Sequence, residues 1–152
     1  MSLIRGILPP NNIVIDHDSH SKPALFERAG VLFEHTLSLR REQVVDSLLQ
    51  REKLGSTALG KGIAIPHGRI AKLREASAAL IKLAEPIPFD SPDGQPVQWA
   101  FVLLVPERAT DLHLQILGEL AQMFSDADFR AQMSRCEDST ALYQLFCNWQ
   151  PS

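Results

Sequence analysis

The stretch "PVQWAFVLLV", Pro96 to Val105, decides the expected fold, because it reads as a strand buried on both faces. From Trp99 onward every residue is apolar, which is typical of a central strand, whereas a strand with one wet face alternates polar and apolar residues. The run ends at Pro106 and is far too short to cross a bilayer. We therefore expect a central strand in a sheet that helices cover on both sides.

Two further strands are expected on the N-terminal side of this one. "ASAALIKLA", Ala76 to Ala84, is connected to the central strand through "EPIPFDSPDGQ", whose prolines and Asp93-Gly94 pair require a turn. "NNIVID", Asn11 to Asp16, holds β-branched residues between turn formers and predicts a short strand or extended segment.

Helices are expected between these strands, since apolar residues recur there at a spacing of three to four. The first runs from about Lys22 to His35, with Pro23 tolerated in its first turn. The second runs from about Arg41 to Lys53. Their apolar faces comprise Leu25, Ala29, Leu32 and Phe33 in the first helix and Val44, Val45, Leu48 and Leu49 in the second.

The C-terminal third is expected to be helical. A helix begins at about Asp111, and two shorter helices follow it. Ser125 and Asp128 have the spacing of a capping box, and Asp138 or Ser139 is the candidate cap of the last helix. The expected inward-facing residues are Ile116, Leu117, Leu120, Ala121 and Phe124 in the long helix and Leu142, Leu145 and Phe146 in the last one.

Length and composition restrict the possible functions. A chain of 152 residues, 45% hydrophobic and 22% charged, is typical of one globular domain, and its mixed strands and helices indicate an α/β sandwich. The domain is expected to span residues 1–152, with a core from about 10 to 148. The net charge of -3 comes without a Lys/Arg block, which argues against nucleic acid or an anionic membrane surface as a partner.

The N-terminal segment does not have the pattern of an export signal, since Pro9 and Pro10 interrupt its short apolar run. We therefore expect a cytoplasmic protein with no direct membrane insertion. Cys136 and Cys147 have neither CxxC spacing nor the density of a secreted disulfide scaffold, so they are expected to be reduced thiols.

The stretch "LGSTALGKGIAIPHGR", Leu54 to Arg69, holds the strongest chemical signal. Within it "GIAIP" predicts a short buried strand that stops at Pro66 and leaves His67 at its exit, on a backbone that the proline constrains. The glycines nearby would let main-chain N–H groups approach an anion, and imidazole is a neutral nucleophile near pH 7. His67 is therefore a candidate phosphoryl acceptor, although a purely structural histidine in a turn fits the same pattern.

His113 is a second candidate. Thr110 as the N-cap would place His113 in the first turn of its helix, in register with Ile116 and Leu120. The helix dipole there favours a bound anion and disfavours a protonated imidazole, so His113 would be a neutral hydrogen-bond donor. The alternative is a partly buried histidine satisfied by the backbone.

Arg51, Ser56 and Thr57 are candidate partners of the same anion. Arg51 lies near the apolar face of its helix, so its guanidinium could clamp a phosphate beside the glycine-rich loop, or extend into water at the helix C-terminus. Ser56 and Thr57 could donate hydroxyls to the anion or merely shape the turn.

Other motifs give weaker signals. "DHDSH", Asp16 to His20, has no partner cluster with metal spacing and is expected to be a solvated turn, so neither a metal nor a cofactor is expected. No HExxH, P-loop or GxSxG pattern indicates a metalloprotease, an ATPase or a serine hydrolase.

Two segments, "REKLGSTALGKGIAIPHGR" (Arg51 to Arg69) and "LVPERATDLHLQILGELA" (Leu104 to Ala121), resemble the IIA domains of the mannitol/fructose class in the bacterial phosphotransferase system. The resemblance extends over nearly the whole chain, including "FDSPDGQPV", and is nearest to the nitrogen-regulatory branch of that class. It implies a mixed parallel and antiparallel sheet and a phosphoryl-transfer carrier that is phosphorylated on the Nε2 atom of a histidine.

By position in the motif, the resemblance implies that His67 is the phosphoacceptor, that His113 is the second pocket histidine and that Arg51 stabilises the phosphate. It places Ser56 and Thr57 in the phosphate-binding loop. An HPr-like phosphocarrier would be the donor. Regulatory targets, with potassium transport proteins and sensor kinases as candidates, would bind according to the phosphorylation state.

Two other functions stay open from the sequence. One is a sugar-specific IIA component of the fructose or mannitol type, which passes phosphate to a IIB domain during transport. The other is a module that binds an anion or a protein partner without becoming phosphorylated.

Overall fold

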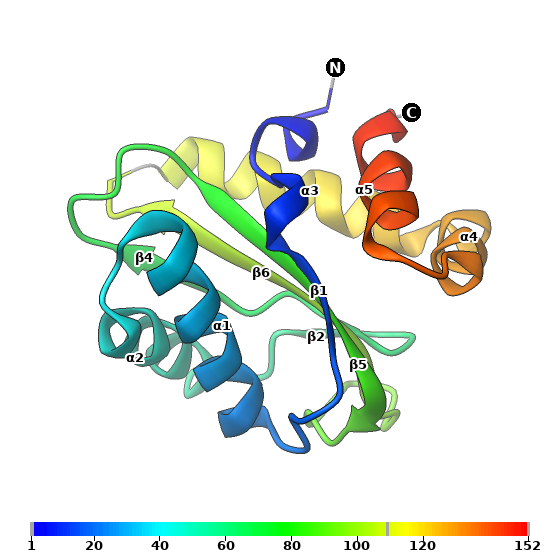
Figure 1. Cartoon of the computed structure of the whole chain (residues 1–152), viewed down its shortest axis with the longest axis horizontal. Coiled ribbons are helices and arrows are strands. Elements are labelled where there is room, and N and C mark those ends of the chain that lie inside the picture. Colours follow the sequence, from blue (N-terminus) through cyan, green and yellow to red (C-terminus); the bar gives the residue numbers. More distant parts are fainter. Residues whose placement is uncertain (1, 109, 152) are drawn as a thin grey trace.

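The computed structural model describes residues 2–108 and 110–151, which form a six-stranded sheet between two layers of helices (Figure 1). The strands are β1 (Ile13–Asp16), β2 (Ala58–Gly60), β3 (Ile63–Ala64), β4 (His67–Ile70), β5 (Ser77–Ile87) and β6 (Val97–Pro106). The helices are α1 (Lys22–Leu37), α2 (Arg41–Glu52), α3 (Thr110–Ser125), α4 (Ala127–Arg135) and α5 (Ser139–Asn148), with short 3-10 helices at Ile4–Gly6 and Pro10–Asn12. The expected mixed α/β sandwich is confirmed.

Strand β6 lies at the centre of the sheet, as its apolar run predicts. The strand order is β1-β5-β6-β3-β2, with β5 antiparallel to β6 on one side and both β3 and β4 parallel to it on the other. Both faces of β6 are buried, and this is why the run has no polar alternation. Trp99, Phe101, Leu103 and Val105 join the core under α3, α4 and α5, while Ala100, Val102 and Leu104 join the core under α1 and α2.

The helices begin and end close to the expected residues. Two expectations are corrected, one about the buried face of α3 and one about the cap of α4. On α3 the side chain of Met123 is buried and Ala121 is exposed, because Ala121 lies at the edge of the apolar stripe and Met123 nearer its centre. Helix α4 is capped by Asp126, whose carboxylate accepts the N–H of Asp128 at 2.9 Å, since Ser125 still belongs to α3.

The remaining expectations for the C-terminal helices are confirmed. Asp138 caps α5 by accepting the N–H of Ala141 at 2.8 Å. Leu142 and Phe146 are buried, and Leu145 packs against the same core. Within the described ranges, no helix is long and apolar enough to span a membrane.

The glycine-rich stretch forms a β-hairpin, where the sequence suggested an anion-lining loop. Strands β2 and β3 pair antiparallel, and the turn between them has positive φ at Gly60 (94°), Lys61 (59°) and Gly62 (80°). The N–H of Lys61 donates to the carboxylate of Asp93 at 2.8 Å, which ties this turn to the connection before β6. Gly60 and Gly62 are therefore explained by the backbone conformation of the turn.

The short buried strand expected in "GIAIP" is β3, which ends before Pro66, but the sequence did not predict that the chain continues along β6 after the proline as β4. A proline has no N–H to donate, but its carbonyl still accepts the N–H of Leu103 at 2.9 Å. The chain therefore stays beside β6, and His67 begins β4, in register with Leu103.

Candidate functional site

His67 is held in one orientation by its own strand. Its Nδ1 atom lies 2.8 Å from the carbonyl oxygen of Ile65, on the other side of Pro66. Because a carbonyl only accepts, Nδ1 carries the proton of the neutral ring, and the lone pair is on Nε2. Burial lowers the pKa of His67, and the Arg51 guanidinium lowers it further against the opposing influence of the Ile65 bond. The imidazole is therefore a neutral base at neutral pH.

His113 from the first turn of α3 lies beside His67. The two ring centroids are 5.2 Å apart, with an angle of 68° between the ring planes. The Nε2 atom of His113 is buried and has no hydrogen-bond partner among the described residues. Burial lowers the pKa of His113, and the neighbouring His67, Arg69 and Arg51 add to this. Helix α3 already begins at Thr110, which the sequence predicts as the cap before the helix, so His113 is the fourth helical residue; the Thr110 side chain lies outside the described residues.

Arg51 from the last turn of α2 also reaches this point. Its Nη1 atom donates to the carbonyl oxygen of Gly55 at 2.9 Å, which fixes the guanidinium at the start of the glycine-rich stretch. In the described part of the chain no carboxylate lies within 4.0 Å of it. Most of its N–H groups are therefore available to an anion.

Gly68 determines how closely α2 approaches β4. A Cβ atom at this position would lie 2.8 Å from the Cβ of Ser47 and 3.0 Å from the Ser47 backbone, distances at which one of the two elements must move. The glycine directly after His67 thus allows the helix that carries Arg51 to pack against the strand that carries the histidine.

These residues line one cavity of about 400 Å³, open to the surface. Two imidazoles and two guanidiniums contribute to it, and none of its lining residues is a carboxylate. Such a cavity favours an anion, and a neutral histidine with a free Nε2 suits it to phosphoryl chemistry. The lining residues are Ser47, Gln50, Arg51, Leu54, His67, Gly68, Arg69 and His113.

Ser56 and Thr57 are not among the lining residues of this cavity. The Ser56 hydroxyl donates to the carbonyl oxygen of Phe89 at 2.6 Å. The Thr57 hydroxyl and N–H both donate to the carboxylate of Glu52, at 2.7 and 3.1 Å. Their expected role in a phosphate-binding loop stays a prediction, and in the structure both hydroxyls anchor the start of the hairpin.

The sequence reasoning did not select Arg69, Gln50 or Ser47. A signal existed for Ser47, which precedes Arg51 by four residues and so lies on the same face of α2. The sequence would have indicated Arg69 only if a strand had been expected after Pro66. In a strand, residues two apart such as His67 and Arg69 have side chains on the same face.

The "DHDSH" segment forms a local turn in which the Asp16 carboxylate accepts the N–H of Asp18 at 2.8 Å and the hydroxyl of Ser19. Over residues 2–108 and 110–151, no cluster of three or more His, Cys, Asp or Glu side chains is arranged to hold a metal ion.

The chain belongs to the EIIA 2 family of the phosphoenolpyruvate-dependent sugar phosphotransferase system, whose model matches residues 6–149. Among curated relatives, a nitrogen regulatory protein from Pseudomonas aeruginosa is 37% identical over 151 residues, covering 99% of this chain and 98% of the relative. A nitrogen regulatory protein from Bradyrhizobium diazoefficiens is 43% identical over 124 residues, covering 82% and 80% of the two chains.

Solved structures show the same relationship. The crystal structure of nitrogen regulatory protein IIA-Ntr from Neisseria meningitidis superposes with a TM-score of 0.89 at 46% identity, covering 95% of this chain and 99% of that one. The IIA mannitol structure from Escherichia coli has a TM-score of 0.74 at 19% identity and so shows a common fold.

Proposed function

We propose that this protein is a regulatory phosphocarrier that accepts a phosphoryl group on Nε2 of His67 from a phosphorylated HPr-like protein. The observation that carries the proposal is the 2.8 Å contact between His67 Nδ1 and the Ile65 carbonyl, which leaves the Nε2 lone pair free at the cavity.

In the transfer step, the Nε2 lone pair of His67 forms the new bond to phosphorus. The bond from phosphorus to the donor nitrogen breaks, and its electron pair stays on the donor imidazole. The His67 ring keeps its Nδ1 proton and acquires a formal positive charge, which the Ile65 carbonyl stabilises. No proton has to leave Nε2, because the neutral tautomer has none there.

Arg51 and His113 bind the phosphoryl oxygens in this proposal. The Arg51 guanidinium is fixed by Gly55 and has no carboxylate partner in the described chain, so its free N–H groups can face the phosphate. His113, kept neutral by its lowered pKa, donates from its unpartnered Nε2–H. Both groups supply positioning and charge stabilisation, which is most of what phosphoryl transfer requires.

The regulatory part of the proposal rests on the relatives, several of which are named nitrogen regulatory proteins. Phosphorylation adds up to two negative charges to a cationic cavity at the surface, which changes the proteins that can bind there. Potassium transport proteins and sensor kinases are the candidate targets.

The test is to incubate the chain with phosphoenolpyruvate, the first enzyme of the relay and an HPr-like carrier, and to measure intact mass. We expect one acid-labile phosphoryl group in the wild type and none in His67→Ala. No mass gain, or an equal gain in His67→Ala, would refute the phosphocarrier. A sugar-specific role is tested by adding a IIB domain and its permease: rapid sugar phosphorylation that requires this chain would replace the regulatory function.

A further inference from the structure

Arg69 shares the cavity with His67, although the sequence motif that ends at Arg69 did not mark it as a site residue. On β4, His67 and Arg69 are two residues apart, so their side chains leave the same face of the strand. Gly68 and Ile70 alternate with them and are buried on the other face. Arg69 lines the cavity together with His113, whose pKa its charge lowers. The guanidinium is therefore close enough to the histidine pair to act on it.

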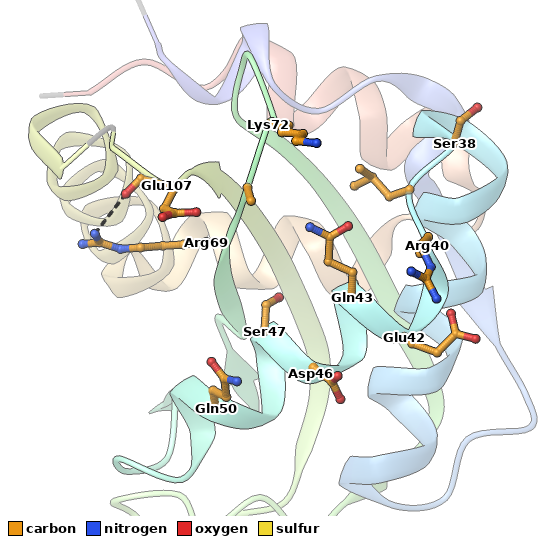
Figure 2. A pocket seen from close by; sticks show the side chains of 12 residues that line it. Ser38, Arg40, Glu42, Gln43, Asp46, Ser47, Gln50, Arg69, Lys72 and Glu107 are labelled. Atoms are coloured by element: carbon orange, nitrogen blue, oxygen red, sulfur yellow. Dashed lines mark hydrogen bonds between the residues drawn. The ribbon is translucent and has the colours of Figure 1, made fainter.

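Among the described residues, one backbone carbonyl holds the guanidinium of Arg69. Its Nη1 atom donates to the carbonyl oxygen of Glu107 at 3.2 Å, and Figure 2 shows the side chain extended toward Glu107 and away from Gln43 and Asp46. No described carboxylate lies within 4.0 Å of it. Arg51 is held in the same way by Gly55. Within residues 2–108 and 111–151, each arginine thus has one N–H anchored on a carbonyl and its other N–H groups without a partner.

We propose that Arg69 is a second phosphate-binding arginine, which contacts the phosphoryl group on His67 from β4 while Arg51 contacts it from α2. The inference rests on the proposed function, since it concerns the phosphoryl group that His67 would carry. Two guanidiniums suit a group with nearly two negative charges, and no described carboxylate lies within 4.0 Å of either arginine to neutralise it beforehand. The Glu107 bond keeps Arg69 extended before the phosphoryl group arrives.

The experiment uses phosphoramidate, a small chemical donor that phosphorylates histidine without any partner protein. Arg69→Gln keeps an N–H donor for the Glu107 carbonyl but removes the charge, whereas Arg69→Ala removes both. We expect both variants to be phosphorylated about tenfold more slowly than wild type, by intact mass, because each loses a charged hydrogen bond to phosphate. Arg69→Lys should be intermediate, and Arg40→Gln, the matched loss of an arginine away from this cavity, should equal wild type.

A second measurement reports on the phosphoryl group itself. In ³¹P NMR titrations of the phosphorylated chain, a nearby guanidinium favours the dianion and lowers the second pKa of the phosphoryl group. We expect this pKa to be higher in Arg69→Gln than in wild type and unchanged in Arg40→Gln. A residue that only tethers the Glu107 segment would not move it.

The outcomes separate the two proposals. If Arg69→Gln matches wild type in rate and in the phosphoryl pKa, Arg69 is not a phosphate ligand and the phosphocarrier stands. If Arg69→Gln matches wild type in rate while Arg69→Ala is slow, Arg69 is a tether and the inference is wrong. If the wild type gains no phosphate, or gains it equally in His67→Ala, the proposed function fails and this inference fails with it.

Discussion

Two cavities adjoin along β4 and α2, and the proposed phosphorylation site lies in the smaller of the two. The larger, of about 760 Å³, is shown in Figure 2, and it shares Ser47, Gln50 and Arg69 with the smaller cavity of about 400 Å³ around His67. Its lining holds both three carboxylates (Glu42, Asp46 and Glu107) and three cations (Arg40, Lys72 and the shared Arg69). The titratable lining groups of the smaller cavity are two arginines and two histidines, with no carboxylate among them. A surplus of positive charge beside a neutral histidine, and not the larger volume, marks the candidate site.

Substitution of His67, which lines only the smaller of the two cavities, should have the largest effect on phosphoryl transfer. We expect His67→Ala to abolish phosphoryl acceptance, because no other lining group of the smaller cavity is an oriented neutral nucleophile. His35→Ala, an exposed histidine on α1, is the matched control and should accept phosphate at the wild-type rate. Intact-mass kinetics with the complete relay measure both, and residual acid-labile phosphate in His67→Ala would contradict the assignment.

Arg51 should have the next largest effect. Arg51→Gln loses a charged hydrogen bond to the phosphoryl group, so transfer should slow by about ten- to a hundredfold. The pKa of His67 should rise in the same variant, because the Arg51 charge that lowers it is gone. Transfer kinetics and NMR titration of the imidazole provide the two readings. Arg40→Gln in the larger cavity should change neither the transfer rate nor the pKa of His67. If Arg40→Gln slowed transfer as much as Arg51→Gln, the smaller cavity would not be the specific phosphate site.

Gly68 tests the packing that brings the walls of the smaller cavity together. Gly68→Ala forces a Cβ against Ser47, so the free energy of unfolding should fall by about 1–3 kcal/mol, measured by urea denaturation. Gly118→Ala is the control, because no atom lies within 4 Å of a Cβ there and alanine favours a helix by about 1 kcal/mol. Equal stability of the two variants would show that α2 does not depend on the glycine for its position.

The pH dependence should reflect the lowered pKa values of the histidine pair. As pH falls, phosphoryl acceptance should persist through the ordinary histidine value of 6.5 and decline only below it, as His67 becomes protonated. The free energy of unfolding should also decrease as the pH falls. Because the pKa values of both histidines are lowered in the folded chain, the unfolded chain binds more protons than the folded one below pH 6.5. NMR titration of the imidazoles measures the values, and a His67 pKa above 6.5 would contradict this.

The smallest effect on transfer is expected for the hydroxyls of Ser56 and Thr57. Thr57→Ala removes a donor to Glu52, whose side chain is only 6% exposed, so stability should fall by about 1–3 kcal/mol in thermal or urea unfolding. Ser56→Ala should transfer phosphate within a few-fold of wild type. If Ser56→Ala instead slows transfer as strongly as Arg51→Gln, the hydroxyl enters the phosphate-binding site when the donor is bound.

The sequence by itself determined the elements whose signals are local. The apolar run of β6 predicted a central strand buried on both faces, and helical spacing predicted both ends of α1 and α2 and the start of α3 to within two residues. The constrained backbone before His67 identified the candidate nucleophile. These features depend on residues close in the chain, so periodicity and turn chemistry are sufficient to find them.

Only the tertiary structure decided how the site is assembled. His113 lies 46 positions after His67 in the numbering of the chain, and the parallel pairing of β4 with β6 brings the start of α3 back to it. The same pairing continues past Pro66, which places Arg69 in the cavity and explains Gly68 as a packing requirement. The spacing of residues in the sequence does not predict that these side chains lie close together, because the distance between two segments depends on how the intervening elements pack.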